Sequence, residues 1–286
     1  MTYGELYHWG EKELLEAGIG EAALEARLLL EHVCGTNRND LLVHPDRAVE
    51  EEQHAVYGKL VRQRCTRIPM QHLTGMQEFM GLSFSVNEHV LIPRQDTEIL
   101  VEEALRSLHD GMEVLDLCTG SGCILISLLH YSNDCRGVGA DISEAALEVA
   151  RRNGEKLLGG KKNGECEVRF VRSDLFSEIS GKYDIIVSNP PYIRSDVIGT
   201  LMPEVRDHEP VLALDGGADG LVFYRKIAAE SRDYLYGGGM LFLEIGYDQG
   251  AAVSTLLEEA GFVEVQVVKD YAGLDRVVYG TRSFGD

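Results

Sequence analysis

One short stretch of the sequence, Asn189-Pro190-Pro191-Tyr192, combines residue types that could hold a planar nitrogen group. We call it the Asn189 turn. It follows the β-branched run at residues 185–187, which is typical of a strand buried on both faces of a parallel sheet. Each proline fixes φ at about −65° and lacks an N–H donor, so the carbonyls of the turn face few competing donors. The Asn189 side-chain oxygen could then accept from a bound NH2 group on which Tyr192 packs. A plain strand-ending turn is the alternative, since asparagine before proline commonly starts one.

A second candidate is the Gly-rich turn at residues 118–122, which follows the apolar stretch at residues 113–117 and leads into an apolar helix at residues 123–130. Glycines let the chain turn tightly, and a helix N-terminus offers free N–H groups to a ligand. A dinucleotide site would need G-x-G-x-x-G, and Leu125 stands where the third glycine would be. This disfavours an NAD site. A tight strand-to-helix connection without a ligand is the alternative.

Acidic residues follow the next two predicted strands. Asp141 comes about 20 residues after the Gly-rich turn, as expected for an acid that accepts hydrogen bonds from two ribose hydroxyls. Asp174, with Leu175 and Phe176 after it, ends the third strand and could bracket an adenine ring. Because the carboxyl ends of parallel strands line one crevice, these acids and the two turns predict a nucleoside site there.

The second half of the sequence contains the elements that must position these residues. Apolar strand patterns alternate with helical ones, which predicts a doubly wound parallel sheet. The Gly- and Lys-rich stretch at residues 159–164 is predicted to be a solvent loop. We expect strands at residues 114–117, 137–140, 168–171, 184–188, 240–245, 263–269 and 276–279.

The first part of the sequence is helical in pattern. Thr2 and Glu5 form a capping-box pattern, and helices are predicted to follow at residues 21–34 and 49–67. Alternation at residues 77–86 predicts a short β-hairpin. The basic residues Lys59, Arg62, Arg64 and Arg67 are predicted to form a solvated face, with docking of an acidic partner as the alternative. We divide the chain into a helical bundle (1–75), a hairpin linker (76–90) and a catalytic domain (91–286).

The composition excludes some classes of partner. Lys and Arg number 27 against 47 Asp and Glu, so the formal net charge is −20. This charge disfavours stable binding to nucleic acid or to anionic membranes, and favours a protein or small-molecule substrate. The scattered cysteines contain no C-x-x-C pair, so we expect reduced thiols and no metal site. No run of about 18 apolar residues occurs, so we expect a soluble, cytoplasmic protein.

Together these motifs resemble a known family. Residues 116–122 with Asp141 are similar to the S-adenosylmethionine site of the seven-stranded methyltransferases, and the Asn189 turn resembles the motif of those that methylate planar amino or amide nitrogens. Further segments resemble the HemK-type family, the protein-(glutamine-N5) methyltransferases of peptide chain release factors, over nearly the whole chain. These segments are EFMGL (78–82), LIPRQDTE (91–98), DGGADGL (215–221) and EIG (244–246).

The resemblance implies an α/β fold, with a seven-stranded Rossmann-like methyltransferase domain after a small helical bundle. It also implies transfer of a methyl group from S-adenosylmethionine, leaving S-adenosylhomocysteine, to the glutamine of the Gly-Gly-Gln motif in release factors. The helical bundle would then recognise the substrate. The catalytic residues implied are Asn189, Pro190, Pro191 and Tyr192. The cofactor residues implied are Asp116, Cys118, Thr119, Gly120, Ser121, Gly122, Asp141, Asp174, Leu175 and Asn189, with Arg94 and Thr97 over the pocket.

The chain departs from the family pattern at two places. Cys118 stands where the family often has glycine and could crowd the methionine part of the cofactor, while Gln95-Asp96 replaces the usual Pro-Glu and conserves the charge.

Two other functions remain as alternatives. Methyltransferases acting on the adenine amino group of DNA or RNA share the four-residue motif, but they need a basic groove. A non-catalytic cofactor-binding module could have the same fold. A serine hydrolase is poorly supported because no G-x-S-x-G occurs, and His208-Glu209-Pro210 lacks the second histidine of H-E-x-x-H and is predicted to be a surface turn.

Overall fold

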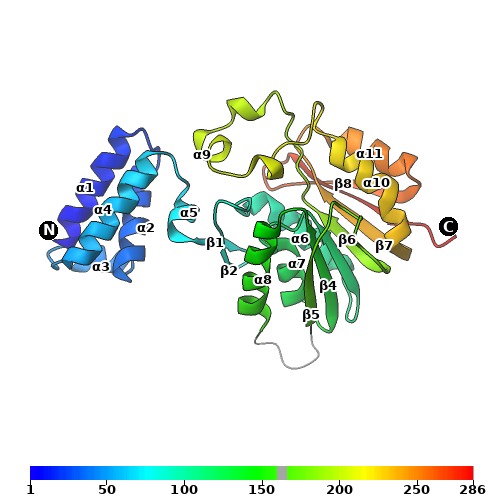
Figure 1. Cartoon of the computed structure of the whole chain (residues 1–286), viewed down its shortest axis with the longest axis horizontal. Coiled ribbons are helices and arrows are strands. Elements are labelled where there is room, and N and C mark those ends of the chain that lie inside the picture. Colours follow the sequence, from blue (N-terminus) through cyan, green and yellow to red (C-terminus); the bar gives the residue numbers. More distant parts are fainter. Residues whose placement is uncertain (160–165, 286) are drawn as a thin grey trace. The chain divides into compact units, whose positions relative to one another are not determined.

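The structure is a computed structural model that describes residues 1–159 and 166–285. The loop predicted at residues 159–164 lies outside the described residues, apart from Gly159. The chain forms two compact units (Figure 1). Unit 1 is Met1–Met76 with Met202–His208, and unit 2 is Gln77–Leu201 with Glu209–Asp286. Within the described part of the chain, every helix is too short or too polar to cross a membrane.

Unit 1 is built from helices. The predicted capping box is present, because the Thr2 hydroxyl accepts from the Glu5 N–H and the Glu5 side chain accepts from the Thr2 N–H. Fully buried Leu6, Leu29 and Tyr57 belong to its apolar core. Two short helices, α3 and α5, have no counterpart in the predicted pattern. The helices are α1 (Tyr3–Glu16), α2 (Ala22–Cys34), α3 (Arg38–Val43), α4 (Glu51–Cys65), α5 (Met70–Thr74) and α9 (Pro203–Arg206).

Helix α9 joins unit 1 through a buried ion-pair cluster. Arg64 is only 5% exposed, and its guanidinium binds Glu25 at 2.5 Å and Glu204 at 3.1 Å. Arg67 pairs with Glu204 at 3.3 Å. The solvated face predicted for the basic residues of α4 is therefore wrong for Arg64: its charge is buried between two carboxylates, as a buried charge requires. Residues 202–208 belong to unit 1, whereas the division made from the sequence assigns them to the catalytic domain.

Unit 2 is organised around a seven-stranded sheet in the order β5-β4-β3-β6-β7-β9-β8. Its strands are β3 (Glu113–Leu117), β4 (Cys135–Asp141), β5 (Cys166–Arg172), β6 (Tyr183–Ser188), β7 (Leu235–Glu244), β8 (Phe262–Lys269) and β9 (Asp275–Arg282). The α/β prediction is confirmed, with one correction: β9 runs antiparallel to both neighbours, so the sheet is mixed. A separate two-stranded sheet pairs β1 (Met76–Phe79) with β2 (Leu82–Ser85).

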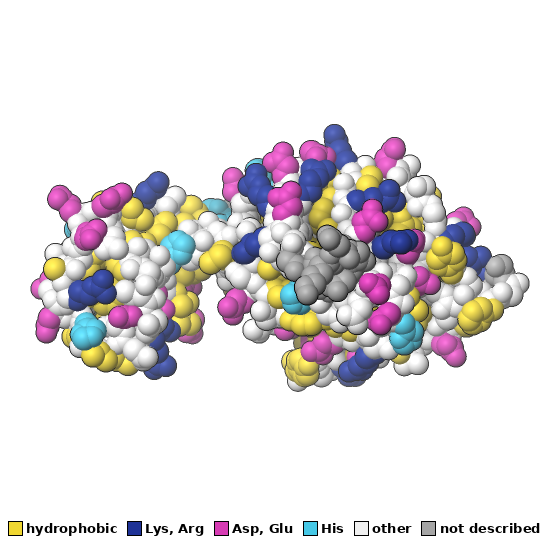
Figure 2. All heavy atoms as spheres, turned by 90° about the horizontal axis from the view of Figure 1, so that it is seen from below, with side chains coloured by type: hydrophobic (Ala, Val, Ile, Leu, Met, Phe, Trp, Pro, Cys, Tyr) yellow, Lys and Arg dark blue, Asp and Glu magenta, His cyan; other side chains and the backbone are white. Residues whose placement is uncertain are grey.

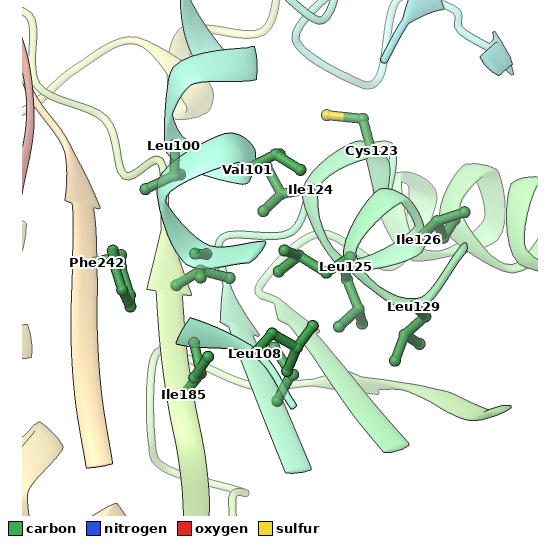
Figure 3. Packing of buried hydrophobic residues seen from close by; sticks show 14 of the residues in the cluster. Leu100, Val101, Leu108, Cys123, Ile124, Leu125, Ile126, Leu129, Ile185 and Phe242 are labelled. Carbon is green, nitrogen blue, oxygen red and sulfur yellow. The ribbon is translucent and has the colours of Figure 1, made fainter. Parts of the chain in front are cut away.

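Helices cover both faces of the sheet (Figure 1). The sequence alternation explains this: Val114, Ile185 and Val187 enter the core beneath one layer, while Leu115 and Ile186 enter the core beneath the other. Figure 3 shows the first core, to which helices contribute Leu100 and Leu125 and strand β7 contributes Phe242. That layer consists of α6 (Glu98–Ser107), α7 (Cys123–His130) and α8 (Glu144–Leu158), and the other of α10 (Val222–Tyr234) and α11 (Gly250–Glu259).

Candidate functional site

The carboxyl ends of the parallel strands line one cavity in unit 2. The register pairs Leu117 of β3 with Ala140 of β4 and with Ser188 of β6, so the segments that follow these strands emerge side by side. The cavity has a volume of about 320 Å³, within the range of small-molecule sites. Of the predicted site residues, those that line it are Arg94, Thr97, Cys118, Thr119, Gly120, Ser121, Asp141, Asp174, Leu175, Asn189 and Pro191.

Four predicted site residues lie outside the lining of this cavity: Asp116, Gly122, Pro190 and Tyr192. Gly122 caps α7 with φ of 79°, and a Cβ there would come within 2.8 Å of Ile126. Glycine is therefore required at this position by backbone conformation and by packing. Tyr192 points its hydroxyl at Glu244 instead of into the cavity.

The Gly-rich turn is held by two acidic residues. Asp141 accepts from the Gly120 N–H at 2.9 Å with one oxygen and from the Ser143 N–H at 2.9 Å with the other. Asp116 is fully buried and accepts from the Thr119 hydroxyl at 2.6 Å. Each carboxylate oxygen has two lone pairs, so Asp141 retains acceptors on the cavity side after both contacts.

Cys118 takes part in the sharp bend of this turn. Its φ is 58°, in the left-handed region that favours glycine. Glycine, the residue that the resemblance leads us to expect here, would adopt this conformation without strain. The other departure, Asp96, keeps an acidic role: its carboxylate pairs with Arg276 at 3.2 Å.

The Asn189 turn begins directly after β6. The Ser188 hydroxyl donates to the Leu117 carbonyl at 2.7 Å and ties β6 to β3. The Asn189 side-chain NH2 donates to the Thr97 hydroxyl at 3.4 Å. Thr97 is 2% exposed and comes from the 3-10 helix Gln95–Thr97. Because its NH2 group is engaged, the Asn189 side chain has its carbonyl oxygen left to accept from a ligand.

The glycine-rich loop at residues 215–221 supports the far end of the Asn189 turn. A Cβ on Gly216 would lie 2.7 Å from the Tyr192 Cα, and one on Gly220 would lie 2.5 Å from the Tyr192 carbonyl oxygen. Gln249 donates to the carbonyls of both Tyr192 and Gly220. Only glycine permits this approach, so residues 215–221 set the backbone of the turn.

The structure corrects one interpretation and adds residues that the sequence patterns did not show. His208-Glu209-Pro210 is no simple surface turn, because the Glu209 side chain is only 1% exposed and its carboxylate binds the Arg94 guanidinium. Burial raises the pKa of Glu209, while the Arg94 charge opposes that rise. The additional lining residues are His89, Val90, Leu91, Pro93, Cys123, Ile124, Ile142, Ser143, Ala146, Ser173, Pro210, Leu212, Ala213, Phe223 and Lys226.

Burial raises the pKa of three acidic residues at or near this site. Burial raises the pKa of Asp116 to about 7, although the Thr119 hydroxyl favours its ionised form. Burial also raises the pKa of Asp141, against three backbone N–H groups. Burial raises the pKa of Glu244 to about 7. The cavity lining combines a carboxylate acceptor at Asp141 with apolar side chains such as Leu175, which are the kinds of group that a nucleoside needs.

Comparison with known proteins identifies the family of this chain. The PrmC N-terminal domain family matches residues 5–75, and the methyltransferase small domain family matches residues 95–205. A methyltransferase of Pyrococcus furiosus with a solved structure covers 72% of this chain and 91% of its own, with a TM-score of 0.52 and 19% identity. That likeness supports the fold alone.

Two sequence relatives span nearly the full chain. The release factor glutamine methyltransferase of Agrobacterium fabrum is 40% identical over 274 residues, covering 93% of each chain. That of Caulobacter vibrioides is 41% identical over 286 residues, covering 99% of this chain and 97% of its own. The predicted enzyme class and cofactor, a methyltransferase that uses S-adenosylmethionine, are confirmed. The chain belongs to the family of release factor glutamine methyltransferases.

Proposed function

We propose that this protein methylates the side-chain amide nitrogen of the glutamine in the Gly-Gly-Gln motif of peptide chain release factors. The observation that carries the proposal is the orientation of Asn189, whose NH2 group is engaged by Thr97. Its oxygen is left to accept a hydrogen from a substrate amide. Methylation in the cytoplasm, where translation is terminated, fits this assignment.

An amide nitrogen is a weak nucleophile because its lone pair is delocalised into the carbonyl. The protein therefore has to position the nitrogen and stabilise the positive charge that develops on it, without a strong base. Asn189 and the Pro190 carbonyl each accept one amide hydrogen, which fixes the nitrogen in line with the methyl donor. After transfer, the methylated nitrogen releases one of its two hydrogens to solvent as a proton, which restores a neutral amide. Pro190 and Pro191 contribute no N–H donors that would compete for these acceptors.

We assign the cofactor to the cavity beside this turn. When bound, S-adenosylmethionine supplies the methyl group. Asp141 would accept from the ribose hydroxyls, and Leu175 together with exposed Asp174 would flank the adenine. Asp116 acts indirectly, because it holds Thr119 in the Gly-rich turn. Arg94, fixed by Glu209, would cover the pocket.

We assign recognition of the whole release factor to unit 1. A three-residue motif offers too little surface for selection, so further contacts are needed. Helix α3 exposes Leu42 and Val43, at 69% and 65%, as apolar contact area. Deleting residues 1–75 would also strip Glu204 of its partner Arg64, so a point variant is the sharper test. Leu42→Ser should slow methylation of whole release factor more than that of a Gly-Gly-Gln peptide. Equal slowing of both, or an equal effect of Leu274→Ser, would contradict this assignment.

The surface of the protein disfavours the rival substrate, the adenine amino group of DNA or RNA. The net charge is −20, and on the face drawn in Figure 2 the basic side chains of each unit are interspersed with acidic ones. Binding to nucleic acid relies on clustered Lys and Arg. We therefore expect no stable binding of nucleic acid by this chain.

Tandem mass spectrometry tests the proposed substrate. Purified release factor and a DNA duplex are incubated in parallel tubes with this protein and S-adenosylmethionine. We expect one added methyl group on the glutamine of the Gly-Gly-Gln motif and none on the DNA. Methyl on adenine would overturn the substrate. Absence of transfer to either would favour a non-catalytic binding module.

A further inference from the structure

We propose that Glu244 is a positioning residue for methyl transfer, which fixes Tyr192 directly and Asn189 through Thr97. The inference rests on the proposed function, since it names what orients the groups that hold the substrate amide. Glu244 is itself outside the lining of the cavity. It acts on the reaction only through the two residues that it holds.

The direct contact is a hydrogen bond across neighbouring strands. Glu244 is the last residue of β7, and the register pairs Ser188 of β6 with Leu243 of β7. The Asn189 turn therefore leaves the sheet beside Glu244. The Tyr192 hydroxyl donates to Glu244 Oε1 at 3.3 Å. This contact explains why Tyr192 points away from the cavity.

The indirect contact runs through Thr97. Its hydroxyl accepts from the Asn189 NH2 group at 3.4 Å, so the hydroxyl hydrogen is left to be donated. Thr97 directly follows Asp96, which pairs with Arg276 at 3.2 Å, and Arg276 donates to the carbonyl of Ile245, next to Glu244, at 3.4 Å. The Thr97 side chain also favours the ionised form of Glu244. Glu244 Oε2 is buried and has no hydrogen-bond partner among the described residues. We infer that Thr97 donates toward this carboxylate and thereby orients Asn189.

Burial of the Glu244 carboxylate destabilises the folded protein unless the charge is paired. Glu244 is 2% exposed at the end of a strand whose neighbours Phe242 and Leu243 are apolar, and burying a charge costs several kcal/mol unless it is paired. Arg276 lies nearby, but its guanidinium already pairs with Asp270 at 3.0 Å and with Asp96 at 3.2 Å. A packing role alone would be served better by an apolar side chain.

A double-mutant cycle separates positioning from packing. Glu244→Gln keeps the size of the side chain but presents one acceptor where the carboxylate presents two. We expect it to lower kcat at least about ten-fold and to leave the Kd for S-adenosylmethionine within about two-fold. Tyr192→Phe removes the donor, so adding Glu244→Gln to Tyr192→Phe should cost less than in the wild-type protein. Glu113→Gln, the same change at the other end of the sheet, serves as the matched control.

The pH dependence gives a second readout. Glu244 accepts from the Thr97 and Tyr192 hydroxyls most strongly when it is ionised, and burial raises its pKa to about 7. The kcat of the wild-type protein should therefore rise with pH through this ionisation, and the rise should be absent in Glu244→Gln. The groups whose charges or hydrogen bonds act on Glu244 are Thr97, Tyr192, Arg276, Asp96, Tyr224 and Cys123.

Several results would overturn the inference. The first is a kcat of Glu244→Gln within about two-fold of the wild-type value. The second is a loss of kcat on adding Glu244→Gln to Tyr192→Phe that equals the loss in the wild-type protein. The third is a rise in the Kd for S-adenosylmethionine as large as the loss in kcat. If Glu244→Gln fails to fold, Thr97→Val tests the same link, and an unchanged kcat in that variant would count against it.

A readout without turnover distinguishes this inference from the proposed function. In protein labelled with carbon-13 at tyrosine Cζ, the Tyr192 resonance is assigned by its loss in Tyr192→Phe. It should shift in Glu244→Gln and stay in place in Glu113→Gln. Lack of transfer by wild-type protein would refute the proposed substrate, whereas an unshifted resonance would refute the role of Glu244.

Discussion

The Gly-rich turn and the Asn189 turn end neighbouring strands of one sheet but are held in different ways. The Gly-rich turn is held mainly through its backbone: Asp141, at the end of β4, accepts from the N–H groups of Gly120 and Ser143, and Asp116 holds the Thr119 side chain. In the Asn189 turn, the side chains of Asn189 and Tyr192 are held by other side chains, which lie 92 and 52 positions away in the sequence. Backbone donors follow from the path of the chain, whereas side-chain partners must be supplied by distant residues.

This difference separates two tasks. Cofactor binding relies on a strand-turn-helix unit together with Asp141 of the next strand. Alignment of the substrate amide relies on a long-range network that single substitutions in other segments can disturb. Variants of the first turn should therefore change cofactor affinity, and variants of the second turn should change turnover.

The largest effect is expected for Asn189→Ala. Loss of one acceptor for the developing charge should lower kcat by about 10²- to 10³-fold, as lost transition-state hydrogen bonds cost about 2.7–4 kcal/mol. Cofactor affinity should stay within several-fold, because the Gly-rich turn is intact. Steady-state methyl transfer and calorimetric titration with S-adenosylhomocysteine measure the two quantities. Asn133→Ala, at an exposed asparagine, is the control. Near-normal turnover of Asn189→Ala would contradict the role assigned to the Asn189 turn.

For Asp141→Asn we expect a smaller effect, which falls on cofactor affinity and not on turnover. The new amide places an NH2 group against the N–H of Gly120 or of Ser143, and one backbone donor loses its acceptor. At about 1.5–3 kcal/mol for a hydrogen bond to a charged group, the Kd for S-adenosylhomocysteine should rise about ten- to hundred-fold. Turnover at saturating cofactor should fall much less. A variant with unchanged Kd and strongly reduced turnover would reverse the assignment of the two turns.

Gly216→Ala tests the support beneath the Asn189 turn. Its Cβ would lie 2.7 Å from the Tyr192 Cα, and relief of this overlap must move the backbone of one segment. We expect a loss of about 1–3 kcal/mol in the free energy of unfolding, with a lowered kcat. Chemical denaturation measures the first and methyl transfer the second. Gly199 has nothing within 4 Å of its Cβ position, so Gly199→Ala is the matched control. Equal stability of the two variants would contradict this packing account.

A pH-dependent effect on stability is expected for Asp116, whose pKa is about 7 in the folded protein against an ordinary value of 3.8. The folded state holds this proton more tightly than the unfolded state. The resulting stabilisation is present at low pH and is lost as the pH rises from about 4 to about 7. Because asparagine does not titrate there, the Tm of Asp116→Asn relative to wild type should improve between about pH 5 and about pH 8. A Tm difference that stays constant or worsens over this range would show that Asp116 is ionised throughout.

Much of unit 2 could be predicted from the sequence, because its signals are local. Buried strands are short and β-branched, and the turns after them contain glycine, proline or acids. Strand direction is different: β9 is antiparallel although it was expected in a parallel sheet, since direction depends on which strands pair. The seven strands and the cavity at their carboxyl ends were predicted.

The residues that escaped prediction are charged groups buried by distant partners. Arg64 resembles any basic residue on a helix until Glu204 reaches it from 140 positions away. Glu209 resembles part of a surface turn until Arg94 binds it across 115 positions. A sequence pattern reports the periodicity of burial and says little about which distant charge pairs with which. These contacts required the three-dimensional structure.

A crystal structure with S-adenosylhomocysteine and a Gly-Gly-Gln peptide tests the central claim most directly. The quantities to measure are the distances from the glutamine amide nitrogen to Asn189 Oδ1 and to the Pro190 carbonyl oxygen. We predict that both are about 2.7–3.2 Å, with Asn189 still donating to Thr97. A glutamine amide bound away from the Asn189 turn, or an Asn189 side chain whose NH2 group faces the substrate, would contradict the account.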